Sequence, residues 1–122
     1  METPDGPADV AWYDFSGKLG EGTNAVFSGH LDYVGFGPAV FWYLRDLQPG
    51  DIIDAVGEDG RTYSYAVIWM KEYAASPTEG DLEEIVGDTS AESLTLITET
   101  GAFDGGQYSH RLVVRAEFIA EP

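Results

Sequence analysis

The stretch Asp51-Ile-Ile-Asp-Ala-Val-Gly-Glu-Asp-Gly-Arg-Thr-Tyr-Ser-Tyr-Ala-Val-Ile-Trp-Met70 decides the fold class. Two runs rich in β-branched and aromatic residues flank the glycine-containing segment 57–60, which is the pattern of a β-hairpin. In the second run every other residue from Tyr63 to Trp69 is large and apolar. This period of two predicts a strand and is hard to reconcile with a helix.

Three further apolar runs predict strands on either side of the hairpin. They are residues 24–28, 94–98 and 111–118. A Gly-rich segment lies between the last two runs, and we expect it to form a loop. If the strands that flank this loop pair with each other, Glu99 and Arg111 face each other across its mouth.

Helical signals are short. Pro38 at a first helical position, followed by apolar residues such as Leu44, predicts a short helix over 39–47 that packs against the sheet. Residues 71–93 mix proline, glycine and acidic residues, so we expect an irregular segment with a turn of helix around 81–85. The expected fold is mainly β, a closed or partly open barrel with one or two short helices.

Length and composition indicate one domain. The 122 residues, 43% hydrophobic and 13% aromatic, suffice for one core and are too few for two. We therefore expect a single domain over residues 1–122, in which 1–20 form an extended N-terminal segment. The first residues have no basic stretch leading into an apolar run, and no window reaches about 18 apolar residues. Neither a signal peptide nor a membrane segment is predicted in this chain.

The charge is strongly acidic. With 22 acidic and 6 basic residues the formal net charge is −16, which argues against nucleic acid or an anionic membrane as partner. The charges are scattered, as expected of a surface that keeps a protein in solution. Asp81, Glu83 and Glu84 could bind a hard cation such as calcium, although they lack EF-hand spacing. The absence of cysteine excludes disulfides and thiol catalysis and leaves the compartment open.

Five segments carry a resemblance to a known family through their order and spacing. They are Asn24-Ala-Val-Phe-Ser-Gly-His-Leu-Asp-Tyr33, Gly37-Pro-Ala-Val-Phe41, Leu47-Gln-Pro-Gly-Asp51, Leu94-Thr-Leu-Ile-Thr98 and Tyr108-Ser-His-Arg-Leu-Val-Val114. Together they resemble a sortase, the transpeptidase β-barrel of bacterial cell surfaces, and look closest to its single-domain, class F-like branch. The resemblance implies an extracellular or cell-surface location. It also implies an extended sorting peptide of Leu-Pro-x-Thr-Gly type, cleaved after Thr and joined to an amine.

The resemblance also implies a site, from which this sequence departs. His30 falls on the family's general acid and base, Arg111 on its oxyanion-stabilising arginine, and Glu99 on its nucleophilic cysteine. A carboxylate that attacked a peptide would form a mixed anhydride, which an amide leaving group does not favour. We therefore expect an inactive domain that binds a sorting-type peptide or a surface partner. The alternative is a variant of an active cysteine transpeptidase.

Other roles for Glu99 remain open. It could act as a general base for water, or it could fill the site as an ion pair with Arg111 and also with His30. His30 and Glu99 could form a metal site with Asp32, but the nearby Arg111 would repel a cation. No cofactor is expected apart from the calcium considered above. His110, next to Arg111, is expected on the loop surface.

The N-terminal region is a second departure from the family. Sortases usually carry one or two more strands before the region that corresponds to Trp12-Tyr13, so the resemblance implies that N-terminal strands are missing here. A shortened barrel would have an open sheet edge, which can pair with another chain. We therefore expect that the chain can form a homo-oligomer by strand exchange.

Overall fold

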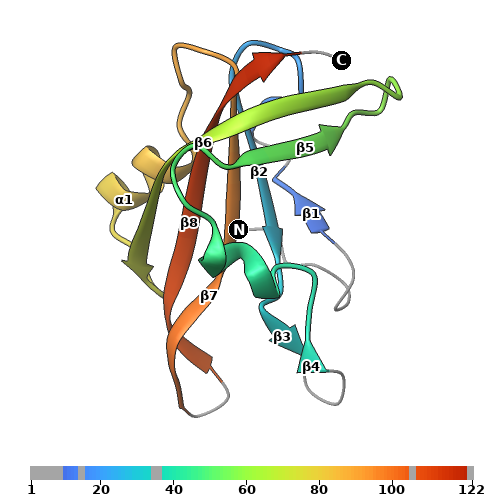
Figure 1. The fold of residues 1–122 in the computed structure, drawn as a ribbon. Helices are drawn as coiled ribbons and strands as arrows, with labels where there is room; N and C mark the ends of the chain where they lie inside the picture. The colour runs from blue at the N-terminus through green and yellow to red at the C-terminus, as the bar shows by residue number, and fades with distance from the viewer. Residues whose placement is uncertain (1–9, 14–15, 34–36, 105–106, 121–122) are drawn as a thin grey trace.

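The computed structural model describes residues 10–13, 16–33, 37–104 and 107–120 (Figure 1). Its elements are β1 Val10–Trp12, β2 Asn24–Gly29, β3 Asp32–Tyr33, β4 Gly37–Pro38, the 3-10 helix η1 Trp42–Asp46, β5 Ile52–Val56, β6 Thr62–Ala74, α1 Glu79–Val86, β7 Ser93–Asp104 and β8 Gln107–Ala120. The predicted mainly β fold with short helices is confirmed.

Six strands form one sheet in the order β1-β2-β7-β8-β6-β5, while β3 and β4 form a separate pair. The large sheet curls into a half-barrel, so the partly open form of the predicted barrel is the one found (Figure 1). Strands β2 and β7 run parallel, and all the other pairs are antiparallel. β1 and β5 are the two sheet edges, and strand exchange through them stays a prediction.

The predicted hairpin forms as β5 and β6, with Ile53 opposite Tyr65. Tyr65 is fully buried and lies in the inner core of the half-barrel with Val67, Leu94 and Val114. β6 runs on to Ala74, so the first residues of the segment predicted as irregular belong to a strand. The reason is the long partner strand β8, which supplies backbone hydrogen-bond partners along this whole length.

The helix expected over 39–47 is shorter than predicted. It is a single 3-10 turn, Trp42–Asp46, held by bonds such as Leu44 N–H to the Phe41 carbonyl at 3.0 Å. Pro38 belongs to β4 and does not open the helix. Only Leu44 of this short helix is buried, so the segment has too few buried apolar side chains to stabilise a full α-helix.

The prediction of a long Gly-rich loop between the last two strands is also wrong. β7 continues to Asp104 and β8 begins at Gln107, so residues 105–106, outside the described ranges, are all that separates them. An irregularity between Thr100 and Phe103 interrupts the ladder, and Gly101 there has a φ of +87°, which favours glycine. The register nevertheless pairs Glu99 with Arg111, as predicted.

The helix α1 covers the face of the sheet opposite to the inner core (Figure 1). It contains the predicted turn and begins with a capping box in which Thr78 and Asp81 each accept a backbone N–H. Ile85 is fully buried in a second core with Val26, Tyr73, Ile97 and Val113.

The candidate site belongs to the same face as this second core. Side chains two residues apart on a strand share a face, and Glu99 and Arg111 lie two residues from Ile97 and Val113. The second core therefore places these two site residues on the face that α1 covers.

Candidate functional site

His30 and Glu99 come together just beyond the point where the parallel pairing of β2 with β7 ends. His30 follows β2 directly and Glu99 lies in β7, and their Nδ1 and Oε1 atoms are 2.9 Å apart. The two side chains are 20% and 34% exposed. Because an ionised carboxylate can only accept hydrogen bonds, Nδ1 carries the hydrogen. The predicted contact between Glu99 and His30 is present.

The second carboxylate oxygen of Glu99 is also occupied. The backbone N–H of Leu31 donates to Oε2 at 2.8 Å, and the Thr98 hydroxyl donates to the same atom at 3.1 Å. Burial alone would raise the pKa of Glu99, but the hydrogen bonds from Leu31, His30 and its own backbone N–H outweigh burial and hold the pKa below its ordinary value. The site therefore contains a fixed carboxylate anion.

The lowered pKa of Glu99 leads us to expect a specific dependence of the protein's stability on pH. Because folding lowers the pKa of Glu99, its contribution is present above the unfolded-state pKa and is lost as the pH falls through the folded-state pKa. Glu99→Gln should therefore lower the free energy of unfolding by about 1 kcal/mol near neutral pH, a modest value because the carboxylate is a third exposed. Urea unfolding of both proteins from about pH 7 to about pH 3 measures this, and the difference should shrink toward acid. Parallel pH profiles would contradict the role given to Glu99.

Arg111 stands opposite Glu99 in the β7–β8 ladder. Its Nε donates to the Ala75 carbonyl at 3.1 Å, which ties the guanidinium to the segment between β6 and α1. The position of the Arg111 guanidinium thus depends on the conformation of the segment between β6 and α1, as well as on the sheet register. His110 is exposed as predicted, but it lies in β8, where its Nδ1 is 2.6 Å from the Ser109 hydroxyl.

Asp32, which the sequence suggests as a metal ligand with His30 and Glu99, lies in β3 and accepts a hydrogen bond from Tyr108. The Tyr108 hydroxyl donates to its Oδ2 at 2.7 Å, and this hydrogen bond is the main reason why the pKa of Tyr108 is raised to about 12. The contact joins β8 to β3 beside the site. Sequence reasoning missed Tyr108 and the Leu31 N–H, although Tyr108 lies only three residues before Arg111.

The three acidic residues proposed for calcium are not assembled into a site. Asp81 caps α1, while the Glu84 carboxylate accepts hydrogen bonds from Lys71 and Tyr73. The carbonyl of Glu83 accepts the Gly87 N–H at the helix end. Within the described ranges, no group of three or more His, Cys, Asp or Glu side chains is placed to hold a metal ion. Helices in the same ranges are too short or too polar to cross a bilayer.

Solved structures of several sortases have the same fold as this chain. A Clostridium perfringens sortase D5 transpeptidase matches with a TM-score of 0.71 at 18% identity, over 92% of this chain and 62% of its own. A lid mutant of Corynebacterium diphtheriae sortase A matches with a TM-score of 0.74 at 24% identity, over 92% and 56%. Sortase C2 of Group B Streptococcus pilus island 1 gives 0.70 at 23%, over 92% and 59%. The chain thus spans less than two thirds of each of these proteins.

Sequence comparison gives the family directly. No curated protein matches the chain. The sequence model of the sortase domain matches residues 2–119, which is nearly the whole chain. Because this match and the half-barrel fold agree, the chain belongs to the sortase domain family.

Proposed function

We propose that this chain is a sortase-like domain without peptidase activity, in which Glu99 occupies the position of the family's nucleophilic cysteine. The observation that carries the proposal is the fixed carboxylate. Glu99 Oε1 lies 2.9 Å from His30 Nδ1, and Oε2 accepts the Leu31 N–H at 2.8 Å. A carboxylate held in this way is a weak nucleophile toward an amide. His30, the proposed acid and base, is engaged by an anion that cannot form a thioester.

Hydrolysis with Glu99 as a general base for water is the less favoured activity. A general base works best with a pKa near the working pH, whereas the pKa of Glu99 lies below its ordinary value. Both of its oxygens are also engaged by neighbouring donors. The observed geometry supports a hydrogen-bonded carboxylate that fills the site more than it supports a general base for water.

The proposed ligand is an extended peptide of the cell-wall sorting type, or a surface protein that presents such a segment. Arg111 would stabilise a carbonyl oxygen of the bound peptide, as the family's arginine stabilises the oxyanion. We also propose the class F-like branch, a single domain over residues 1–122 and a cell-surface location. Family membership supports the location, since sortases are cell-surface proteins.

The alternative is that the chain is a variant of an active cysteine transpeptidase that cleaves Leu-Pro-x-Thr-Gly peptides and joins them to an amine. In that case the positions of His30 and Arg111 remain those of a working enzyme, and only the nucleophile differs. The family match supports this alternative and the inactive domain equally.

Peptide binding without cleavage is the expected result for the unmodified protein. A quenched Leu-Pro-x-Thr-Gly peptide should stay intact, while NMR titration should show shifts at His30, Leu31 and Arg111 with a Kd of about 1 mM. Arg111→Gln should weaken binding about fivefold through loss of a charged hydrogen-bond donor. Arg61→Gln, which removes the same charge from the β5–β6 turn, is the matched control. Cleavage by the unmodified protein would refute the proposal, and so would an absence of shifts around these residues.

A further inference from the structure

A second feature of the α1 face lies apart from His30 and Glu99. An open hollow of about 360 Å³ is lined by Trp69, Met70, Lys71, Glu84 and Arg115. These residues come from β6, from α1 and from β8 (Figure 1). Two of the six basic residues of this acidic chain thus border a single hollow.

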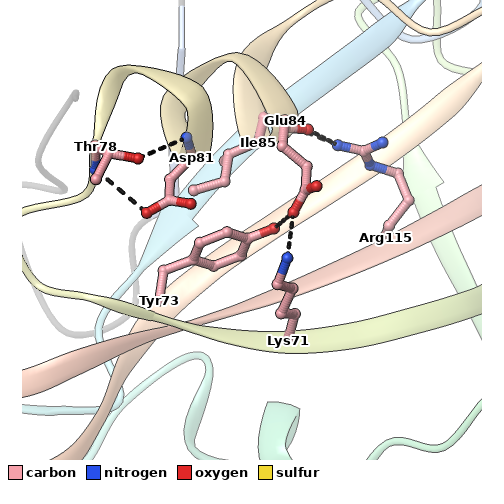
Figure 2. Close-up of polar contacts among 7 residues, drawn as sticks. All are labelled: Lys71, Tyr73, Thr78, Asp81, Glu84, Ile85 and Arg115. Carbon is pink, nitrogen blue, oxygen red and sulfur yellow. Dashed lines mark hydrogen bonds and ion pairs between the residues drawn. The ribbon is translucent and has the colours of Figure 1, made fainter.

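Arg115 is the most unusual of these residues because its guanidinium is buried. The residue is only 7% exposed. Its Nε donates to the Thr95 hydroxyl at 2.8 Å, and its Nη2 donates to the Ile85 carbonyl at 3.1 Å. Nη2 also donates to the Glu84 carbonyl at 2.8 Å (Figure 2). The guanidinium is therefore held in one orientation by β7 and by the C-terminal turn of α1.

The remaining nitrogen of Arg115, Nη1, has no hydrogen-bond acceptor among the described residues. No described side-chain nitrogen or oxygen is both fully buried and without a partner, so Nη1 reaches solvent. Since Arg115 borders the hollow, this is where its two free N–H groups are available. Arg115 thus brings to the rim of the hollow an oriented guanidinium with a pair of charged donors that no described residue uses.

The charge of Arg115 is only partly compensated by the protein. Its acceptors are a neutral hydroxyl and two carbonyls at the end of α1, where the helix dipole contributes about half a negative charge. The Glu84 carboxylate instead accepts hydrogen bonds from the Lys71 ammonium at 2.7 Å and from the Tyr73 hydroxyl (Figure 2). A buried guanidinium without a carboxylate partner favours an anion at its open side.

The wall of the hollow favours an anion with an apolar body. The Arg115 guanidinium lies 4.9 Å from the centre of the Trp69 ring, and the half-buried Met70 adjoins this tryptophan. The indole offers contact area to a flat or aliphatic group, whereas small inorganic anions would leave that surface exposed to water.

We propose that this hollow binds a carboxylate carried on a small apolar or aromatic body, through the Nη1 of Arg115, the ammonium of Lys71 and the surface of Trp69. The site is independent of peptide binding beside Glu99 and stands or falls separately. The carboxylate belongs either to a chain terminus or to an acidic side chain of a partner. Glu84 lines the same hollow and repels this ligand, so its charge sets the affinity.

The test is an NMR titration of the ¹⁵N-labelled protein with benzoate, benzamide and benzamidine, three probes of similar shape and different charge. Benzoate should shift the Arg115 Nε–H and the Trp69 indole N–H with a Kd of about 5 mM, and benzamide should bind about tenfold more weakly. Benzamidine should shift neither signal. Equal shifts from benzoate and benzamide, or tighter binding of benzamidine, would overturn the proposal.

Two charge variants should act in opposite directions. Lys71→Met should weaken benzoate binding about fivefold, and Glu84→Gln should tighten it about threefold, because one removes an attractive charge and the other a repulsive one. Lys18→Met is the control for Lys71→Met, since both lysines are 53% exposed. Changes of the same sign in both variants would indicate mere structural damage and would sink the proposal. Both substitutions leave the Arg115 anchors in place, so neither depends on a refolded core.

Two further probes distinguish the two possible sources of the carboxylate. N-acetylphenylalanine presents a chain terminus, and N-acetylglutamate α-amide presents an acidic side chain. Tighter binding of the first identifies a C-terminal ligand, and tighter binding of the second identifies an internal acidic residue. If neither competes with benzoate, the hollow does not take peptide carboxylates and the proposal fails.

Discussion

Glu99→Cys is expected to produce cleavage of a Leu-Pro-x-Thr-Gly peptide where the unmodified protein shows none. The substitution replaces a fixed carboxylate by a thiol beside His30 and opposite Arg111. A thiolate attacks amides and forms a thioester, and removal of a nucleophile costs other hydrolases a factor of about 10⁶. We therefore expect a gain on the order of 10³-fold or more over background, measured with a quenched peptide and with an added amine as acceptor.

Three comparisons show whether the gained activity comes from this site. Glu99→Ser should stay inactive, because an alcohol needs stronger activation than a thiol. Adding Arg111→Gln to Glu99→Cys should lower the rate about 100-fold through loss of oxyanion stabilisation. Silence of Glu99→Cys together with intact peptide binding would remove the active-enzyme alternative. Silence together with no binding would mean that this half-barrel lacks the peptide surface altogether.

Asn24→Leu is expected to lower the free energy of unfolding by about 3 kcal/mol, because it removes three hydrogen bonds, two of them buried, without leaving a large cavity. Asn24 is 1% exposed, and its Nδ2 donates to the Ile85 and Gly87 carbonyls at 3.0 Å each. Its Oδ1 accepts the Thr95 hydroxyl at 2.5 Å. Urea unfolding measures the loss, and thermal unfolding should show a midpoint about 10 °C lower.

The neighbouring residue provides a matched control for this substitution. Thr23 Oγ1 donates to Asp88 Oδ1 at 2.8 Å in an exposed contact, so Thr23→Val should cost less than about 1 kcal/mol. Equal losses for Thr23→Val and Asn24→Leu would show that water replaces the buried bonds. If the expected loss is seen, Asn24 and Arg115 together anchor the C-terminal end of α1 to the sheet.

Strand positions were the most predictable part of this protein. The β5–β6 hairpin, β2 and the first half of β7 follow from runs of apolar and β-branched residues that alternate or cluster locally. The pairing of Glu99 with Arg111 could also be predicted, because two adjacent strands joined by a short segment pair in antiparallel register. The full length of β7 and β8 could not be predicted, because the residues near the β7–β8 turn are polar or glycine. Their backbones pair as far as Asp104 and Gln107 regardless of side-chain polarity.

The candidate site was predictable in its members but not in its contacts. The resemblance pointed to His30, Glu99 and Arg111, and the structure brings the first two to 2.9 Å. Sequence reasoning gave no means to expect that the Leu31 N–H would bind Glu99 or that Ala75 would hold Arg111. A backbone N–H or carbonyl carries no side-chain signal, so its role appears only when the strands are in place.

The sequence by itself determined that this chain is a mainly β, acidic, cysteine-free sortase-like domain, because periodicity, composition and motif order are local properties. Only the tertiary structure decided how Asn24, Thr95 and Arg115 meet beneath α1, and which guanidinium nitrogen is left open to the hollow beside Trp69. Asn24 and Thr95 are 71 residues apart in the chain. Their contact is set by the parallel pairing of β2 with β7 and by the burial of Ile85, which are non-local terms that no sequence window contains.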